Sequence, residues 1–488
     1  MLKIKLLRSP MIQKSSFSFQ KQFLIAILFL ISTVHVSAAT GYEIKIRMNG
    51  LRDTVCYLGN HFGEKQYVKD TVRVDHDGWA VFKGNEPLPG GIYLVVLPSH
   101  TYFEIVVNEQ KFTIETDTID FVESMKITGS LENKLFNDHQ KFIIAKTKYS
   151  QTLKAKMDAN KDNKDSVAYY KKAITDVDKE VKDYRIKVMN DYPQTFMAKI
   201  IKTMSEPEVP EAPKDEKGNV TDSTFQFRYY KAHYLDNVDF SDDRLLRTPL
   251  LQTKIKTYTQ QLTVPLPDSI IPSVDTIIEK SKANKEVFKY SVATLANYYE
   301  TSNIMGYDKV FVHIAEKYYL SNDAYWADST LKAKIHERVM KIKPNILGEK
   351  AYNLVMPDTG FVMHSLQDIK EKFTILAFWD PTCSHCKHEI PMLSAYRDSA
   401  REHGISVEVF SVGIESDIEL WKKFIRDNKL KWINVSDLYN NTNFRNYYDI
   451  YSTPVIYLLD EQKRIIAKRL DTEKIRDFIS NSMKGTKK

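Results

Sequence analysis

Cysteine is scarce in this chain: Cys56, Cys383 and Cys386 are the only three among its 488 residues. A protein that depends on a disulfide framework carries many more cysteines, in pairs, so that class is excluded. Cys56 has no sequence neighbour to pair with, and a bond between Cys383 and Cys386 would close a loop too short to remove much chain entropy. This pair is therefore better explained by chemical reactivity than by stability.

A strong charge bias is also lacking. The formal net charge is +7, but the first 39 residues hold five basic residues and no acidic one, which leaves 7 − 5 = +2 for the remainder. A nearly balanced surface gives no electrostatic reason to expect nucleic acid as a partner.

Long apolar runs are lacking except at residues 23–36, a stretch of 14 residues. That length is short for crossing a bilayer. A basic segment precedes the run, and Ser37-Ala38-Ala39 follows it, as in a cleavable export signal. We expect residues 1–39 to be a signal peptide cleaved near Ala39, which predicts a periplasmic protein that contacts the membrane only through this segment before cleavage. An uncleaved anchor is the alternative.

The length suggests about three domains. Residues 40–129 contain short strands with alternating apolar side chains, which predicts an antiparallel β sandwich or barrel. Segments 68–74 and 79–82 flank Asp75-His-Asp-Gly78, which we interpret as a hairpin turn. Residues 130–343 have helical periodicity, with a charged break at 158–165 and a mobile loop at about 206–223.

Residues 344–488 alternate between strand and helix patterns, which indicates an α/β domain. A continuous apolar strand at 374–379 is followed by a helix that starts near Cys383. The order β-α-β-α-β-β-α that follows is typical of a thioredoxin fold.

The two cysteines lie in the first turn of that helix, where the backbone N–H groups and the helix dipole favour a thiolate. Cys383, at the exposed end, is the expected nucleophile of disulfide exchange. Cys386, one turn further in, is the expected resolving cysteine.

The segment resembles the TlpA/ResA-type extracytoplasmic thioredoxin-like proteins over residues of about 345 to 485. The resemblance is carried by Phe378-Trp379, Cys383-Ser-His-Cys386, Glu389, Pro391 and Ser452-Thr453-Pro454-Val455. It implies a cis-proline loop at Pro454 beside the cysteine pair, with the Thr453 backbone free to pair with an extended substrate. It also implies protein thiols or disulfides as partners, an upstream thiol donor in the envelope, and no cofactor.

Two further residues of this motif are candidates for a role in the chemistry. Glu389 lies on the same helical face as Cys386 and is a candidate proton relay, or else a surface acid. His385 is a candidate for redox tuning, because a histidine between the cysteines can stabilise the thiolate and make the site a better oxidant. The direction of electron flow therefore stays open. Residues 40–129 resemble, by pattern, β domains found ahead of thioredoxin-like domains in bacterial envelope proteins.

Three alternatives compete with disulfide exchange. A zinc site would use Cys383, Cys386 and either His385 or His388, but a fourth ligand is missing. Thiol peroxidase chemistry is suggested by Pro381-Thr-Cys383. The chain could also be an envelope binding or scaffold module with an accessory redox domain. We predict an exported thiol-disulfide oxidoreductase that acts as a reductase on protein substrates.

Overall fold

The computed structural model describes residues 41–415, 417–437 and 441–485, so the predicted signal peptide lies outside the described residues. The chain divides into two compact units, residues 1–201 and 202–488, which are described here one at a time. Among the described helices, none is long and apolar enough to span a membrane.

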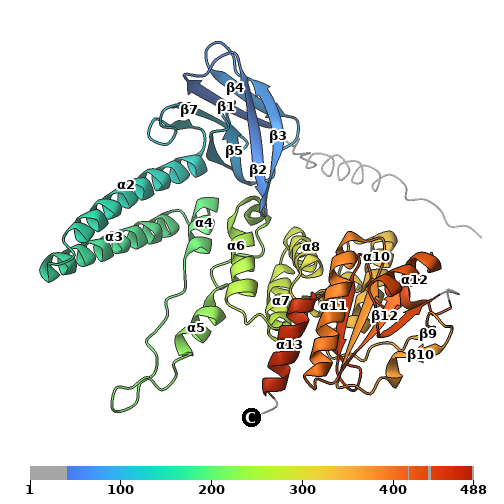
Figure 1. The fold of residues 1–488 in the computed structure, drawn as a ribbon. Helices are drawn as coiled ribbons and strands as arrows, with labels where there is room; N and C mark the ends of the chain where they lie inside the picture. Colours follow the sequence, from blue (N-terminus) through green and yellow to red (C-terminus); the bar gives the residue numbers. More distant parts are fainter. Residues whose placement is uncertain (1–40, 416, 438–440, 486–488) are drawn as a thin grey trace, which may run out of the picture. The chain divides into compact units, whose positions relative to one another are not determined.

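The first unit begins with a β sandwich (Figure 1). Its two four-stranded sheets have the orders β4-β1-β7-β8 and β3-β2-β5-β6. Apolar side chains that alternate along the strands, such as Ile44, Ile46 and Leu58, meet between the sheets in one buried core. The strands are β1 (Tyr42–Asn49), β2 (Val55–Phe62), β3 (Lys65–Arg73), β4 (Trp79–Gly84), β5 (Gly91–Val96), β6 (Tyr102–Val107), β7 (Lys111–Asp117) and β8 (Lys126–Thr128).

Three details of the sandwich differ from expectation. β1 and β7 pair in parallel, whereas all other pairs in this unit are antiparallel. The hairpin prediction was wrong, because β3 and β4 belong to different sheets and the turn that starts at Asp75 connects them. Strand β2 was not predicted, because its register shifts between Leu58 and Gly59 and interrupts the alternation.

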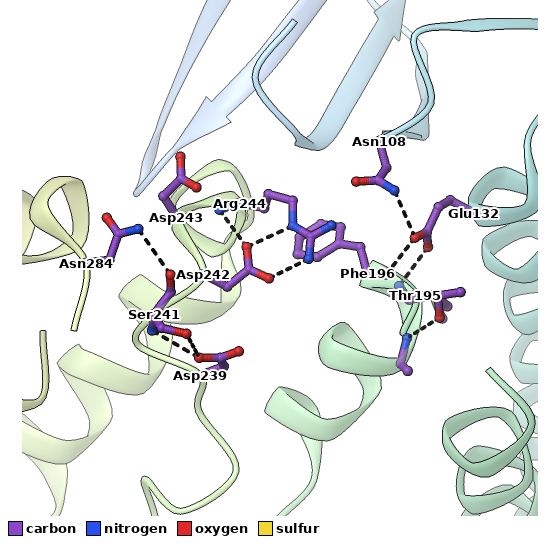
Figure 2. A network of polar contacts seen from close by, with 12 residues as sticks. Asn108, Glu132, Thr195, Phe196, Asp239, Ser241, Asp242, Asp243, Arg244 and Asn284 are labelled. Atoms are coloured by element: carbon purple, nitrogen blue, oxygen red, sulfur yellow. Dashed lines mark hydrogen bonds and ion pairs between the residues drawn. The ribbon is translucent and has the colours of Figure 1, made fainter. Parts of the chain in front are cut away.

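Two long helices, α2 (Leu131–Ala159) and α3 (Lys164–Asp191), follow as an antiparallel pair, and α4 (Phe196–Met204) comes next (Figure 1). The Glu132 carboxylate of α2 is buried and accepts hydrogen bonds from the backbone N–H groups of Phe196 at 2.6 Å and Met197 at 2.9 Å. Figure 2 shows this carboxylate at the start of α4, where it satisfies N–H groups that have no partner within the helix.

The second unit starts with a helical region, which the sequence predicted. The predicted loop at 206–223 contains no helix. A 3-10 turn at Asp243–Arg247 follows α5, and its start is fixed by an ion pair between Asp242 and Arg244 (Figure 2). The helices of this region are α5 (Phe225–His233), α6 (Leu250–Lys256), α7 (Pro267–Ser281), α8 (Lys285–Thr301), α9 (Tyr307–Ile314) and α10 (Ser329–Ile342), with π-helical turns after α6 and α9.

The second unit ends in a five-stranded mixed sheet of order β13-β12-β11-β14-β15, preceded by a small hairpin. β14 runs antiparallel to the central strand β11, whereas β12 runs parallel to it. The elements are β9 (Val355–Pro357), β10 (Met363–Ser365), β11 (Phe373–Trp379), α11 (Ser384–Glu402), β12 (Val407–Gly413), α12 (Ile418–Asp427), β13 (Ile433–Ser436), β14 (Val455–Leu459), β15 (Ile465–Lys468) and α13 (Thr472–Gly485).

Strand β11 is buried along its whole length, with alternate side chains in a separate core on each face of the sheet. On one face, Trp379 and Cys386 pack with apolar residues of α11 and α13, which lie side by side in Figure 1. The predicted fold class is confirmed: a β sandwich, a helical middle region and a C-terminal thioredoxin-like α/β domain. Edge strand β13 was missed, because only four residues form it.

Candidate redox site

The cysteine pair lies where the buried central strand gives way to a helix. β11 ends at Trp379, and Cys383 is the N-cap residue of α11 with extended backbone angles (φ −67°, ψ 126°). Cys383 is partly exposed, whereas Cys386, one turn into the helix, has 0% exposure. Both sulfur atoms are free thiols. One cysteine can therefore meet a substrate, and the other can meet only its partner.

The Cys383 thiol contacts the loop that precedes β14. Its Sγ atom donates to the Thr453 carbonyl oxygen at 3.2 Å. Burial raises the pKa of this thiol, but hydrogen bonds from the Thr453 side chain, from the N–H and thiol of Cys386 and from the His385 N–H outweigh that effect and hold the pKa below its usual value. A lowered pKa supplies thiolate, the nucleophilic form, near neutral pH.

Cys386 has the opposite environment. Burial raises the pKa of its thiol to about 11, and the nearby Cys383 sulfur adds to the increase. The backbone N–H of Asp380 lies 3.5 Å from the Cys386 Sγ atom. Cys386 is therefore a protected thiol that holds its proton to higher pH than Cys383 does.

The Thr453–Pro454 peptide bond is cis. β14 begins one residue later, at Val455, and its antiparallel pairing with Phe378 of β11 brings this loop next to the start of α11. The pairing of two strands that are distant in sequence thus brings together the two motifs that the sequence singled out.

Glu389 has a specific partner in the fold. Its Oε1 atom accepts hydrogen bonds from the Thr472 hydroxyl at 2.6 Å and from the Thr472 backbone N–H. Thr472 is the first residue of α13, so the carboxylate satisfies an N–H group that the helix itself leaves unpaired. Glu389 therefore joins α11 to α13 in addition to any role in proton transfer.

A cleft of about 740 Å³ adjoins the pair, and His385 and His388 are exposed at its wall. Within the described part of the chain, no cluster of three or more His, Cys, Asp or Glu side chains has metal-site geometry. Other residues that line the cleft are Glu389, Tyr451, Pro454, Arg469 and Arg338.

Sequence reasoning missed an ion-pair cluster in this cleft. Asp449, which is 6% exposed, accepts a hydrogen bond from Arg338 Nη1 at 2.7 Å and forms a second ion pair with Arg469. Arg338 belongs to α10, 111 positions before Asp449. No local motif marks these residues, because only the tertiary fold brings them together.

The fold defines a class: a thioredoxin-like domain, here with two free thiols at the start of helix α11. Family comparisons agree with this class. The AhpC/TSA family matches residues 347–468, and two domains of unknown function, DUF5106 and DUF4369, match residues 148–345 and 42–136. No curated protein matches the chain.

Solved structures include relatives of parts of this chain. A domain described as a "possible thiol-disulfide isomerase" from Cytophaga hutchinsonii is 44% identical, covers 29% of this chain and 96% of its own, and has a TM-score of 0.28. The thioredoxin domain of a thiol-disulfide oxidoreductase from Bacteroides vulgatus is 26% identical, covers 28% and 96%, and has a TM-score of 0.26. A thioredoxin-like protein from Bacteroides caccae is 19% identical, covers 57% and 99%, and has a TM-score of 0.46.

The 44% identity extends over nearly the whole of the Cytophaga domain. The chain therefore carries a thioredoxin-like domain of the AhpC/TSA family at its C-terminus.

Proposed function

We propose that the protein exchanges disulfides with protein substrates through Cys383 and Cys386, and that it works as an exported reductase. The observation that carries the proposal is the asymmetry of the pair. Cys383 is accessible and has a lowered pKa, whereas Cys386 is buried within the same helical turn and has a raised pKa.

In the first step, the Cys383 thiolate attacks one sulfur of a substrate disulfide. A bond forms between Cys383 Sγ and that sulfur, the substrate S–S bond breaks, and the second substrate sulfur leaves as a thiolate that takes a proton from water. We assign to the Thr453 backbone, beside cis-Pro454, the role of pairing with the extended substrate segment.

In the second step, Cys386 attacks Cys383 Sγ and releases the other substrate thiol. The Cys386 proton ends on the departing sulfur, the substrate has gained two electrons, and the protein holds a Cys383–Cys386 disulfide. A thiol donor in the envelope would reduce this disulfide again. We keep Glu389 as the candidate proton relay and His385 as the candidate that tunes the potential of the pair.

Insulin reduction tests this proposal. With dithiothreitol as the electron source, the wild-type protein should accelerate insulin disulfide reduction, and Cys383→Ser should abolish the acceleration. Cys56→Ser is the matched control, because Cys56 is 0% exposed in the β sandwich and belongs to the other unit. Wild-type protein that gives no rate above the dithiothreitol background would refute the proposal.

The same protein preparations also distinguish disulfide exchange from the thiol peroxidase alternative. A thiol peroxidase would consume hydrogen peroxide at the expense of dithiothreitol, through a sulfenic acid at Cys383. Disulfide exchange predicts insulin reduction without peroxide consumption above background. Full biological activity in a Cys383→Ser/Cys386→Ser double variant would instead favour the binding-module alternative.

A further inference from the structure

The helical region contributes to the wall of the redox cleft. Asn303, which follows α8, and Arg338 of α10 line the cleft together with Ser384, His385 and Pro454 of the thioredoxin-like domain. The surroundings of the cysteine pair are therefore built by two regions of the second unit.

Arg338 is held in a defined orientation. Its Nε atom donates to Glu300 Oε1 at 3.0 Å, its Nη1 atom donates to Asp449 Oδ1 at 2.7 Å, and its guanidinium lies 4.6 Å from the centre of the Tyr451 ring. Only 16% of the Arg338 side chain and 6% of the Asp449 side chain are exposed. Charge-assisted hydrogen bonds with so little exposure are strong, and removing Arg338 leaves the buried Asp449 carboxylate with Arg469 as its remaining cation.

Both contacts of Arg338 in the thioredoxin-like domain fall on one short segment. Asp449 and Tyr451 precede Thr453 by four and two residues. At its other end this segment is fixed by the pairing of Val455 with Phe378. Thr453, between the two anchors, is the residue that contacts the Cys383 thiol. A contact made by α10 can therefore determine where Thr453 lies.

We propose that Arg338 is a positioning residue for the redox site: it holds residues 449–453 through Asp449, and thereby keeps Thr453 on the Cys383 thiol. The biological meaning of this role rests on the proposed disulfide exchange. The role itself can be measured directly, through the reactivity of the Cys383 thiol. It assigns to the helical region the task of setting the reactivity of the nucleophile.

The test is the pH profile of Cys383 alkylation by iodoacetamide, followed by mass spectrometry. In Arg338→Gln, loss of the hydrogen bond that the Thr453 side chain gives to the Cys383 sulfur should raise the pKa of Cys383, because that bond stabilises the thiolate. We expect about threefold slower alkylation at pH 7, equivalent to a midpoint about half a pH unit higher. Lys334→Gln is the matched control, because it removes an exposed cation from the same helix. Its profile should equal that of the wild type.

A second variant separates positioning from the charge of Arg338 itself. If charge alone mattered, Asp449→Asn would remove a negative charge near the thiolate and lower the Cys383 midpoint. If Arg338 acts by positioning, Asp449→Asn should also raise the pH midpoint of Cys383 alkylation. The Arg338→Gln/Asp449→Asn double variant should then have a midpoint no higher than that of the more affected single variant, because both substitutions act on one contact.

The outcomes are distinct. A wild-type profile in Arg338→Gln, or a lowered midpoint in Asp449→Asn, would overturn the inference. If Arg338→Gln does not fold, Arg338→Lys carries the same prediction with a smaller shift, because lysine keeps the cation but cannot reproduce the two-pronged contact. Absence of insulin reduction by wild-type protein would refute the proposed function. The alkylation profiles would still test whether Arg338 positions Thr453, because they do not depend on insulin reduction.

Discussion

Cys383 and Cys386 are three residues apart, yet hydrogen bonds and burial move their pKa values in opposite directions. The reason is that the two sulfur atoms are buried to different extents. The N-cap position places one sulfur at the surface against Thr453, and the next turn places the other inside the apolar core beneath α11. The roles proposed for the two thiols, nucleophile and resolving cysteine, thus follow from where a helix begins relative to a buried strand.

This contrast predicts selective alkylation of the reduced protein. Only the thiolate reacts, so a lowered pKa gives reaction at lower pH and a raised pKa delays it. Iodoacetamide should label Cys383 at lower pH than an ordinary cysteine, whereas Cys386 should resist until the pH approaches its pKa of about 11. Peptide mass spectrometry across a pH series measures both sites.

Cys56 serves as the internal reference in that series, because burial raises the pKa of its thiol to about 12. It should stay unlabelled until the protein unfolds. Labelling of Cys386 at the same pH as Cys383 would contradict the proposed division of roles.

At this scale the sequence predicted four residues that the fold brings together. Cys383 and Cys386 follow the apolar strand β11, Pro454 precedes the apolar strand β14, and the family resemblance placed the Thr453–Pro454 loop beside the cysteine pair. The bond from Glu389 to Thr472 and the ion pair between Arg338 and Asp449 were not predictable, because each joins elements that only tertiary packing brings together.

Among the elements, α11 and α13 show how a motif residue serves the fold. Glu389→Ala removes the acceptor at the first N–H of α13, and we expect a loss of about 1 kcal/mol in the free energy of unfolding, as for other lost helix caps. Glu389→Gln retains an oxygen acceptor and should lose much less. Urea denaturation of the two variants measures the difference.

The same pair of variants tests the proton relay. Glutamine cannot exchange a proton, so Glu389→Gln should slow insulin reduction while keeping most of the stability if Glu389 is a relay. Wild-type turnover in Glu389→Gln would restrict this residue to joining the two helices.

Prediction of the elements worked where periodicity is regular and failed where a strand is short or interrupted. β11 and the helices of the middle region have long, consistent patterns, and the structure contains them. β2 carries a register shift at Gly59, and β13 has only four residues, so neither has a readable alternation. The parallel pairing of β1 with β7 is a property of the tertiary fold and leaves no local signal.

On the scale of the whole second unit, a buried lysine joins the helical region to the sheet. Lys468 at the end of β15 is 7% exposed, pairs with Asp308 of α9 and donates to the Asn345 carbonyl. Burial lowers the pKa of Lys468, and the neighbouring Asp308 counteracts that change. The domain boundary predicted near residue 344 is therefore crossed by charged contacts.

Removing one partner of this pair should be costly. We expect Asp308→Asn to lower the free energy of unfolding by about 3 kcal/mol, because it leaves a buried cation without its counter-charge. Chemical denaturation followed by circular dichroism measures the change. Lys309→Gln is the control, since Lys309 pairs with the exposed Asp268 and its loss should change stability by less than about 1 kcal/mol. Equal stability of the two variants would contradict the role assigned to Lys468.

The third cysteine has a consequence for synthesis. Within the described residues, strands β1–β8 pair only with one another, so the sandwich that encloses Cys56 has all its sheet partners once residue 128 has been made. A ribosome adds Cys383 much later. Under the proposed export, Cys56 can thus be enclosed before the cysteine pair emerges, which protects the chain from mispairing of its three thiols in an oxidising compartment.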